Sequence, residues 1–159
     1  MKLWLMRHAQ AEPWSTDIAA DQERALSARG RLDCTALNEW LQQYPEHRAN
    51  TILVSPARRT RETAERVLGS LHGIASVICD PLWAASPDEL KRVITLHADS
   101  PEPIMLIGHN PGLSELLAWL TDSSFGNMSP GTLMMLDVSV PLHAGCGEIT
   151  LSVQPSDLT

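Results

Sequence analysis

The sequence predicts an α/β protein, a three-layer α/β/α sandwich with a mostly parallel central sheet. Short apolar segments rich in β-branched residues alternate along the chain with longer segments whose apolar residues recur every three or four positions. This alternation is typical of βαβ units, in which helices cover both faces of a parallel sheet. The chain has 159 residues. That length predicts a single domain, residues 1–159, with a substantial core.

The first strand and the first long helix are separated by a segment without periodicity. Residues 3–6 (LWLM) form the apolar run of a buried strand, and residues 9–24 predict a loop. A helix should begin at Ser27 and end before Pro45. The apolar stripe of this helix is expected to comprise Leu32, Ala36, Leu37, Trp40 and Leu41.

The second strand is predicted at residues 51–54 (TILV), followed by a helix. Pro56 suits the first turn of that helix and Ser55 could cap it. The inner face of the helix is expected to comprise Thr63, Ala64, Val67, Leu68 and Leu71.

Two more helices are expected in the second half of the chain. One begins near Pro87, where acidic residues fill the first turn. The other follows Asn110, a suitable N-cap, with Pro111 as its first residue. The remaining strands are expected at residues 77–79, 104–107, 132–138 and 148–153.

Composition excludes some classes of partner. The net charge of −7 argues against a general binder of nucleic acid or of anionic membranes. The longest apolar run, residues 116–120, is far shorter than the roughly 20 residues of a membrane span. Arg7 interrupts the apolar start of the chain, which therefore does not resemble a secretory signal. We expect a cytoplasmic protein whose three cysteines stay reduced.

Candidate functional residues follow three of the predicted strands. Ligands bind beyond the carboxyl ends of the strands in open α/β sheets. That rule selects Arg7 and His8, the segment from Ser55 onward, and His109. One histidine at a strand end is most often structural, but two at the same edge, one beside an arginine, favour nucleophilic or acid–base chemistry.

Positive charge is concentrated just after the second strand. The segment from Arg58 to Arg66 contains four arginines. Most of them could belong to a solvent-exposed helix face, on which they would form ion pairs with Glu62 and Glu65. The positive end of the helix dipole disfavours an arginine in the first turn of a helix, unless an anion binds at the same place. Phosphate is the anion that best matches helix N–H groups and a guanidinium. A metal site is not expected, because Asp17, Asp21 and Asp80 lack recognisable ligand spacing and the arginines would repel a cation.

These motifs resemble the signatures of the histidine phosphatase (phosphoglycerate mutase-like) superfamily. Arg7-His8-Ala9 resembles its Arg-His-Gly motif, and residues 55–64 (SPARRTRETA) resemble its second block, with Arg59 at the arginine position. Residues 108–112 (GHNPG) resemble the block that carries the second histidine. Residues 24–30 (RALSARG) are similar to a segment of the SixA-like phosphohistidine phosphatases. The motifs occur in the family's order.

The resemblance implies a phosphoglycerate mutase-like fold and a metal-independent phosphatase that needs no cofactor. His8 would attack the phosphorus and His109 would be the second catalytic residue, with Arg7 and Arg59 binding the phosphate. Further substrate-binding residues would be Arg24, Asn110 and Ser55.

The sequence departs from the family in one informative segment. Larger relatives carry a glutamate general acid after the third strand, whereas residues 80–86 (DPLWAAS) contain none. A phosphomonoester gains about 10²–10⁴-fold from such an acid, and phosphohistidine needs it less. The general acid could still come from a nearby carboxylate that reaches back into the site: Asp80, Asp88 or Glu89. Core packing is favoured for Trp83 over a place at the substrate opening.

Three functions are therefore compatible with the sequence. A phosphatase acting on the phosphohistidine of a histidine phosphotransfer domain or phosphocarrier protein is favoured, since the short chain leaves no insertion to cap the site. A phosphatase or mutase acting on a small phosphomonoester is the first alternative. A non-catalytic module that binds phosphorylated partners is the second.

Overall fold

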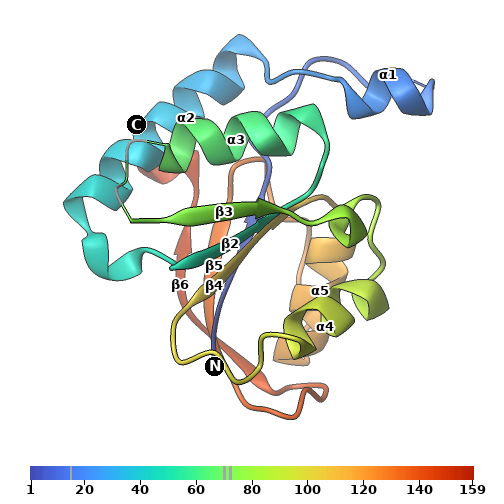
Figure 1. The fold of residues 1–159 in the computed structure, drawn as a ribbon, viewed down its shortest axis with the longest axis vertical. Coiled ribbons are helices and arrows are strands. Elements are labelled where there is room, and N and C mark those ends of the chain that lie inside the picture. The colour runs from blue at the N-terminus through green and yellow to red at the C-terminus, as the bar shows by residue number, and fades with distance from the viewer. Residues whose placement is uncertain (15, 70, 72) are drawn as a thin grey trace.

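The computed structural model describes residues 1–14, 16–69, 71 and 73–159, and it is built around one six-stranded sheet (Figure 1). The strand order is β3-β2-β4-β1-β5-β6. Neighbouring strands from β3 to β1 pair in parallel, whereas β5 runs antiparallel to both β1 and β6. The strands are β1 (Lys2–Arg7), β2 (Thr51–Val54), β3 (Ala75–Ile78), β4 (Ile104–Gly108), β5 (Leu133–Val138) and β6 (Gly147–Val153). The predicted, mostly parallel sheet is confirmed.

Helices cover both faces of the sheet. α2 (Ala28–Gln43) and α3 (Arg58–Leu68) lie on one face, and α4 (Pro87–Thr95) and α5 (Gly112–Thr121) lie on the other (Figure 1). This arrangement confirms the α/β/α sandwich. No helix in the described ranges is long and apolar enough to cross a membrane.

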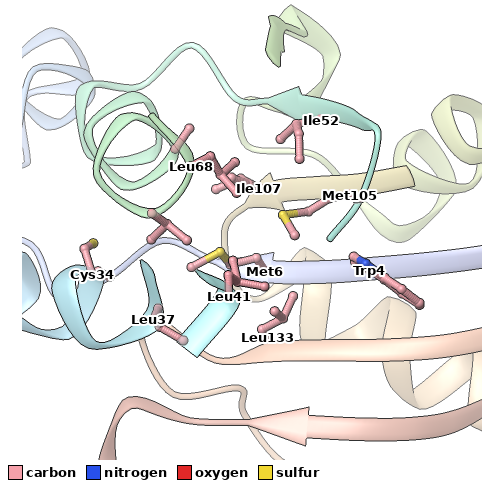
Figure 2. Close-up of a cluster of buried hydrophobic side chains, with 14 of the residues drawn as sticks. Trp4, Met6, Cys34, Leu37, Leu41, Ile52, Leu68, Met105, Ile107 and Leu133 are labelled. Atoms are coloured by element: carbon pink, nitrogen blue, oxygen red, sulfur yellow. The ribbon is translucent and has the colours of Figure 1, made fainter. Parts of the chain in front are cut away.

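Alternate residues of the strands belong to two separate hydrophobic cores, because successive side chains of a strand point to opposite faces of the sheet. Trp4 and Met6 of β1 pack with Leu37 of α2 and Leu68 of α3 (Figure 2). Leu3 and Leu5 belong to the second core, with α4 and α5. The strand is thus buried on both faces, as parallel-sheet strands are, and its carboxyl end is held rigidly where the candidate residues follow.

Two predictions about the first 43 residues are wrong. The segment 9–24 is not only a loop, since it contains the short helix α1 (Ile18–Gln22), capped by the Asp17 side chain. Leu32 is 67% exposed instead of facing the core. The buried face of α2 comprises Gly30, Asp33, Cys34, Leu37 and Leu41. At Gly30 an added Cβ would lie 2.0 Å from the Gln10 carbonyl oxygen, and this close backbone contact fixes which face of α2 turns inward.

The two predicted helix caps are also wrong, and their side chains are used elsewhere. α3 begins at Arg58 with Ala57 as its N-cap, so Ser55 caps no helix. α5 begins at Gly112 with Pro111 as its N-cap. The Asn110 side chain donates to the Met128 carbonyl and accepts from Ser114 Oγ. Both Ser55 and Asn110 are therefore free to shape the edge of the sheet. β3 begins two residues before the predicted strand.

Candidate active site

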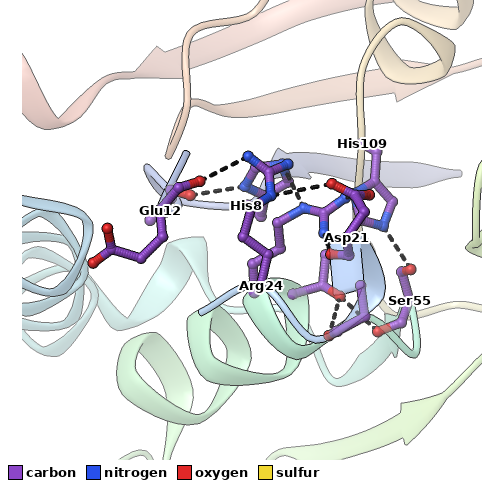
Figure 3. A network of polar contacts seen from close by, with 10 residues as sticks. His8, Glu12, Asp21, Arg24, Ser55 and His109 are labelled. Atoms are coloured by element: carbon purple, nitrogen blue, oxygen red, sulfur yellow. Dashed lines mark hydrogen bonds and ion pairs between the residues drawn. The ribbon is translucent and has the colours of Figure 1, made fainter. Parts of the chain in front are cut away.

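A pocket of about 370 Å³ lies at the carboxyl ends of β1 and β4 and the start of α3. It brings together most of the residues expected at the site, although they are spread over 104 positions from Arg7 to Asn110. Its lining residues are Arg7, His8, Trp14, Asp21, Arg24, Arg59, Trp83, Ala84, His109 and Asn110. Ser55 does not line the pocket but contacts His109 directly (Figure 3).

His8 presents an unprotonated ring nitrogen to the pocket. It follows β1 and is only 7% exposed. Its Nδ1 lies 2.7 Å from the Ala9 carbonyl oxygen, which can only accept, so Nδ1 carries the proton. The other nitrogen, Nε2, is then unprotonated, and Arg59 Nε donates to it over 3.3 Å. The geometry leaves Nε2 as the ring nitrogen of His8 that could act as a nucleophile.

His109 is held beside His8 by a buried serine. The two imidazole centroids are 5.3 Å apart. His109 Nε2 lies 2.7 Å from Oγ of Ser55, which is fully buried at the end of β2. His109 Nδ1 is buried without a hydrogen-bond partner in the described part of the chain. Ser55 therefore orients the ring and leaves one ring nitrogen available.

Both histidines are neutral at physiological pH. Burial is the main cause that lowers the pKa of His8 from 6.5 to about 3, and the positive charges of Arg59 and Arg7 act in the same direction. Burial, followed by the charges of Arg59, Arg7 and Arg24, lowers the pKa of His109 from 6.5 to about 3. Neutral imidazole is the form that can attack phosphorus.

These lowered pKa values predict that the protein loses stability as the pH falls below 6.5. In that range the unfolded chain binds protons at His8 and His109, and the native state does not until about pH 3. We expect each histidine to lower the free energy of unfolding by about 1.4 kcal/mol per pH unit within this window. Urea unfolding at pH 7 and pH 5 measures the loss. A double variant, His8→Gln with His109→Gln, should flatten the profile, and an equal slope in both proteins would contradict the assignment.

Three arginines surround the histidines. Arg7 Nη1 donates to the Met128 carbonyl over 2.8 Å, and Arg24 Nη1 donates to the Glu12 carbonyl over 2.9 Å. Burial, reinforced by the charge of Arg24, lowers the pKa of Arg7 from its ordinary value. Arg7 Nε makes no hydrogen bond within the described residues, whereas Arg24 Nε forms an ion pair with Asp21. Clustered cations with unused donors are the features of an anion site.

Asp21 is a site residue that the sequence did not identify as such. Its carboxylate lies 3.3 Å from Arg59 Nη2 and 3.1 Å from Arg24 Nε, and its carbonyl oxygen accepts from Arg59 Nη1 over 2.7 Å (Figure 3). The sequence pattern suggests only a metal ligand at this position, and without recognisable ligand spacing. The one feature of the sequence that indicates its role is its spacing of three residues from Arg24, which allows an ion pair on a helix. No three His, Cys, Asp or Glu side chains in the described ranges converge to hold a metal ion.

The carboxylates considered as general acids lie outside the pocket. Asp88 pairs with Lys91 at 2.6 Å, and Glu89 forms a capping box with Ser86. Asp80 is exposed and does not line the pocket. In that same segment Trp83 does line it, contrary to the expected core packing. Asp21 is thus the one carboxylate among the described lining residues.

Comparison with known proteins identifies relatives of both the sequence and the fold. The model of the histidine phosphatase superfamily (branch 1) matches residues 3–84. No curated protein sequence matches the chain. Among solved structures, the protein histidine phosphatase SixA complexed with tungstate is 21% identical, with a TM-score of 0.82 and complete coverage of both chains.

Two further structures share the fold. A chain from Agrobacterium tumefaciens assigned as phosphohistidine phosphatase SixA is 22% identical, with a TM-score of 0.82 and coverage of 97% of both chains. The mycobacterial glucosyl-3-phosphoglycerate phosphatase in complex with VO3 is 16% identical, with a TM-score of 0.70 and coverage of 94% of this chain and 97% of that one. The fold is therefore shared by proteins named for protein-borne and for small phosphorylated substrates.

Proposed function

Because the chain belongs to the histidine phosphatase superfamily, branch 1, we propose that it hydrolyses phosphohistidine on a protein, such as a histidine phosphotransfer domain or a phosphocarrier protein. One observation carries this proposal. The pocket places the unprotonated Nε2 of His8 beside Arg59 and Arg7, whose Nε is an unused donor, while both oxygens of its one described carboxylate, Asp21, face guanidinium groups. Such a site is equipped for a leaving group that needs no proton from the enzyme.

The first step transfers the phosphoryl group between two imidazoles. His8 Nε2 attacks the phosphorus and forms an N–P bond, and the N–P bond of the substrate breaks. If the second ring nitrogen of the substrate is protonated, the substrate leaves as neutral histidine. The phosphorylated His8 keeps its Nδ1 proton, which the Ala9 carbonyl oxygen holds. Protons and charge balance without a general acid.

The second step returns the enzyme to its starting state. Water attacks the phosphorus, the Nε2–P bond breaks with its electron pair returning to His8, and dihydrogen phosphate leaves. Arg7, Arg59 and the free Nδ1 of His109 donate to the phosphoryl oxygens in both steps. Phosphoryl transfer depends mainly on such positioning and charge stabilisation. Because guanidinium groups supply that charge, we propose that the reaction is metal-independent.

The additional site residues have supporting roles in this proposal. Ser55 holds His109, Arg24 extends the anion site, and Asn110 shapes the rim through its bond to Met128. The binding of tungstate by SixA and of VO3 by the mycobacterial enzyme supports an oxyanion pocket in this fold. We propose a cytoplasmic location, consistent with three free cysteines, and phosphorylated protein as the partner.

A small phosphomonoester is the second candidate substrate. The mycobacterial relative is named for a sugar phosphate, and Asp21 places a carboxylate in the pocket. An alkoxide leaving group requires a proton in the transition state. Asp21 would have to leave Arg59 and Arg24 to supply it.

A substrate comparison tests the proposal. We expect the purified protein to release phosphate rapidly from a phosphocarrier protein phosphorylated on histidine, slowly from common sugar phosphates, and equally well with a metal chelator present. Aspartyl phosphate on a response regulator is the matched control for a labile protein-borne phosphate. Rapid release from sugar phosphates alone would reject the proposal in favour of the small-molecule alternative.

A further inference from the structure

The indole of Trp83 lies beside His109 and Arg59, the two side chains next to Nε2 of His8. Its ring meets the His109 ring edge-on, with centroids 5.3 Å apart and an interplanar angle of 88°. The Arg59 guanidinium carbon lies 5.5 Å from the centroid of the same indole. Arg59 and His109 are themselves within contact of His8. The indole is therefore adjacent to the position of the phosphoryl group.

The backbone around Trp83 is built to hold the indole there. The short 3₁₀ helix Asp80–Leu82 follows β3, and Leu82 anchors it in the core with 1% exposure. Ala84, which also lines the pocket, adopts the left-handed conformation with φ of 50°. That conformation is costly for a residue with a Cβ, and it occurs where surrounding structure imposes it.

A close backbone contact provides that constraint. A Cβ added at Gly112 would lie 2.2 Å from the Ala85 carbonyl oxygen. The segment 83–85 therefore lies directly against the N-terminus of α5, two residues beyond the turn that carries His109 and Asn110. Only glycine allows this approach. The indole is thus fixed relative to His109 by a rigid contact and not by a mobile loop.

We propose that Trp83 is a specificity-determining residue that stacks on a planar leaving group, the imidazole of phosphohistidine; this inference rests on the proposed function. In an in-line transfer the leaving group lies on the side of the phosphorus away from His8. A planar ring in the pocket gains aromatic contact with the indole. A leaving group without a ring gains none, so Trp83 favours imidazole over other leaving groups.

The test compares two small P–N substrates that differ in the ring. Phosphoimidazole releases imidazole, and phosphoramidate releases ammonia. We expect Trp83→Ala to lower kcat/KM for phosphoimidazole about 3- to 10-fold relative to phosphoramidate, the value of one aromatic pair. Trp83→Phe should retain most of the preference. Because the readout is a ratio, it does not depend on the fraction of the variant that folds. Trp40→Ala, which removes a half-buried indole on α2, should leave the ratio unchanged.

The outcomes separate this inference from the proposed function. Unchanged kcat/KM for both substrates in Trp83→Ala, with both substrates hydrolysed by the unmodified enzyme, would overturn the stacking role alone. Equal losses on both substrates would also overturn it and would identify Trp83 as a structural support. Failure of the unmodified enzyme on both P–N substrates, with turnover of sugar phosphates, would overturn the proposed function. A lower ratio rescued by phenylalanine supports the inference.

Discussion

Replacing His8 by alanine is expected to lower phosphate release from phosphohistidine at least about 10³-fold, since the variant lacks the proposed nucleophile, on which both proposed steps depend. His8 is the residue whose Nε2 is kept unprotonated by the Ala9 contact and by burial. Rapid acid-free quenching of the unmodified enzyme should trap one phosphoryl group per chain. Peptide mapping under alkaline conditions should place it on His8, and the label should be absent from the variant.

A matched histidine controls for the loss of an imidazole. His143 is exposed and lies far from the pocket in the loop between β5 and β6. We expect His143→Ala to retain full activity and full labelling of His8. A phosphoryl group mapped to His109 would contradict the assignment, because His109 Nε2 is hydrogen-bonded to Ser55 and Nδ1 is the nitrogen proposed to donate a proton to the phosphoryl oxygens. Full activity of His8→Ala would show that water attacks the substrate directly.

The sheet was predictable because its signal is local. Each buried strand of the parallel part is a short apolar run bounded by polar residues, and hydrophobic burial outweighs most competing local effects. The position of Leu32 was not predictable in this way. The stripe through Leu32 matches the helical period, but the contact between Gly30 and Gln10 rotates α2. Such backbone contacts between distant segments leave no periodic trace in a sequence.

The site was predictable in part for a topological reason. Parallel strands end at the same edge of the sheet, so His8 and His109 were expected to meet although 101 positions separate them. The structure places their rings 5.3 Å apart. Asp21 was missed because it lies on a helix of only five residues, with no periodicity to detect. Core packing was the prediction for Trp83; its place in the pocket accompanies the left-handed turn at Ala84 and the contact between Ala85 and Gly112, which no local pattern in the sequence shows.

Replacing Arg59 by alanine is expected to reduce kcat/KM about 10³-fold, the scale of removing a guanidinium from a phosphoryl-transfer site. Arg59 is 5% exposed and contacts His8 Nε2 with Nε, while its other two nitrogens hold Asp21. Arg59→Lys should recover only a small part of the loss, because one ammonium cannot reproduce a planar fork of donors. Steady-state kinetics on a phosphohistidine protein measures both effects. Arg66→Ala is the matched control, since Arg66 is exposed near the end of the same helix.

The pH profile distinguishes a chemical role of Arg59 from a structural one. The positive charge of Arg59 is one cause of the lowered pKa of His8, so its removal raises that pKa above about 3. In the proposed mechanism activity requires neutral His8 and is lost as the pH falls through its pKa. The acidic limb of the profile should therefore move to higher pH in Arg59→Ala and stay in place in Arg66→Ala. A profile that keeps its shape while activity falls would mean that Arg59 acts only by maintaining the fold around Asp21, because a charge removed from beside His8 must change the proton affinity of that ring.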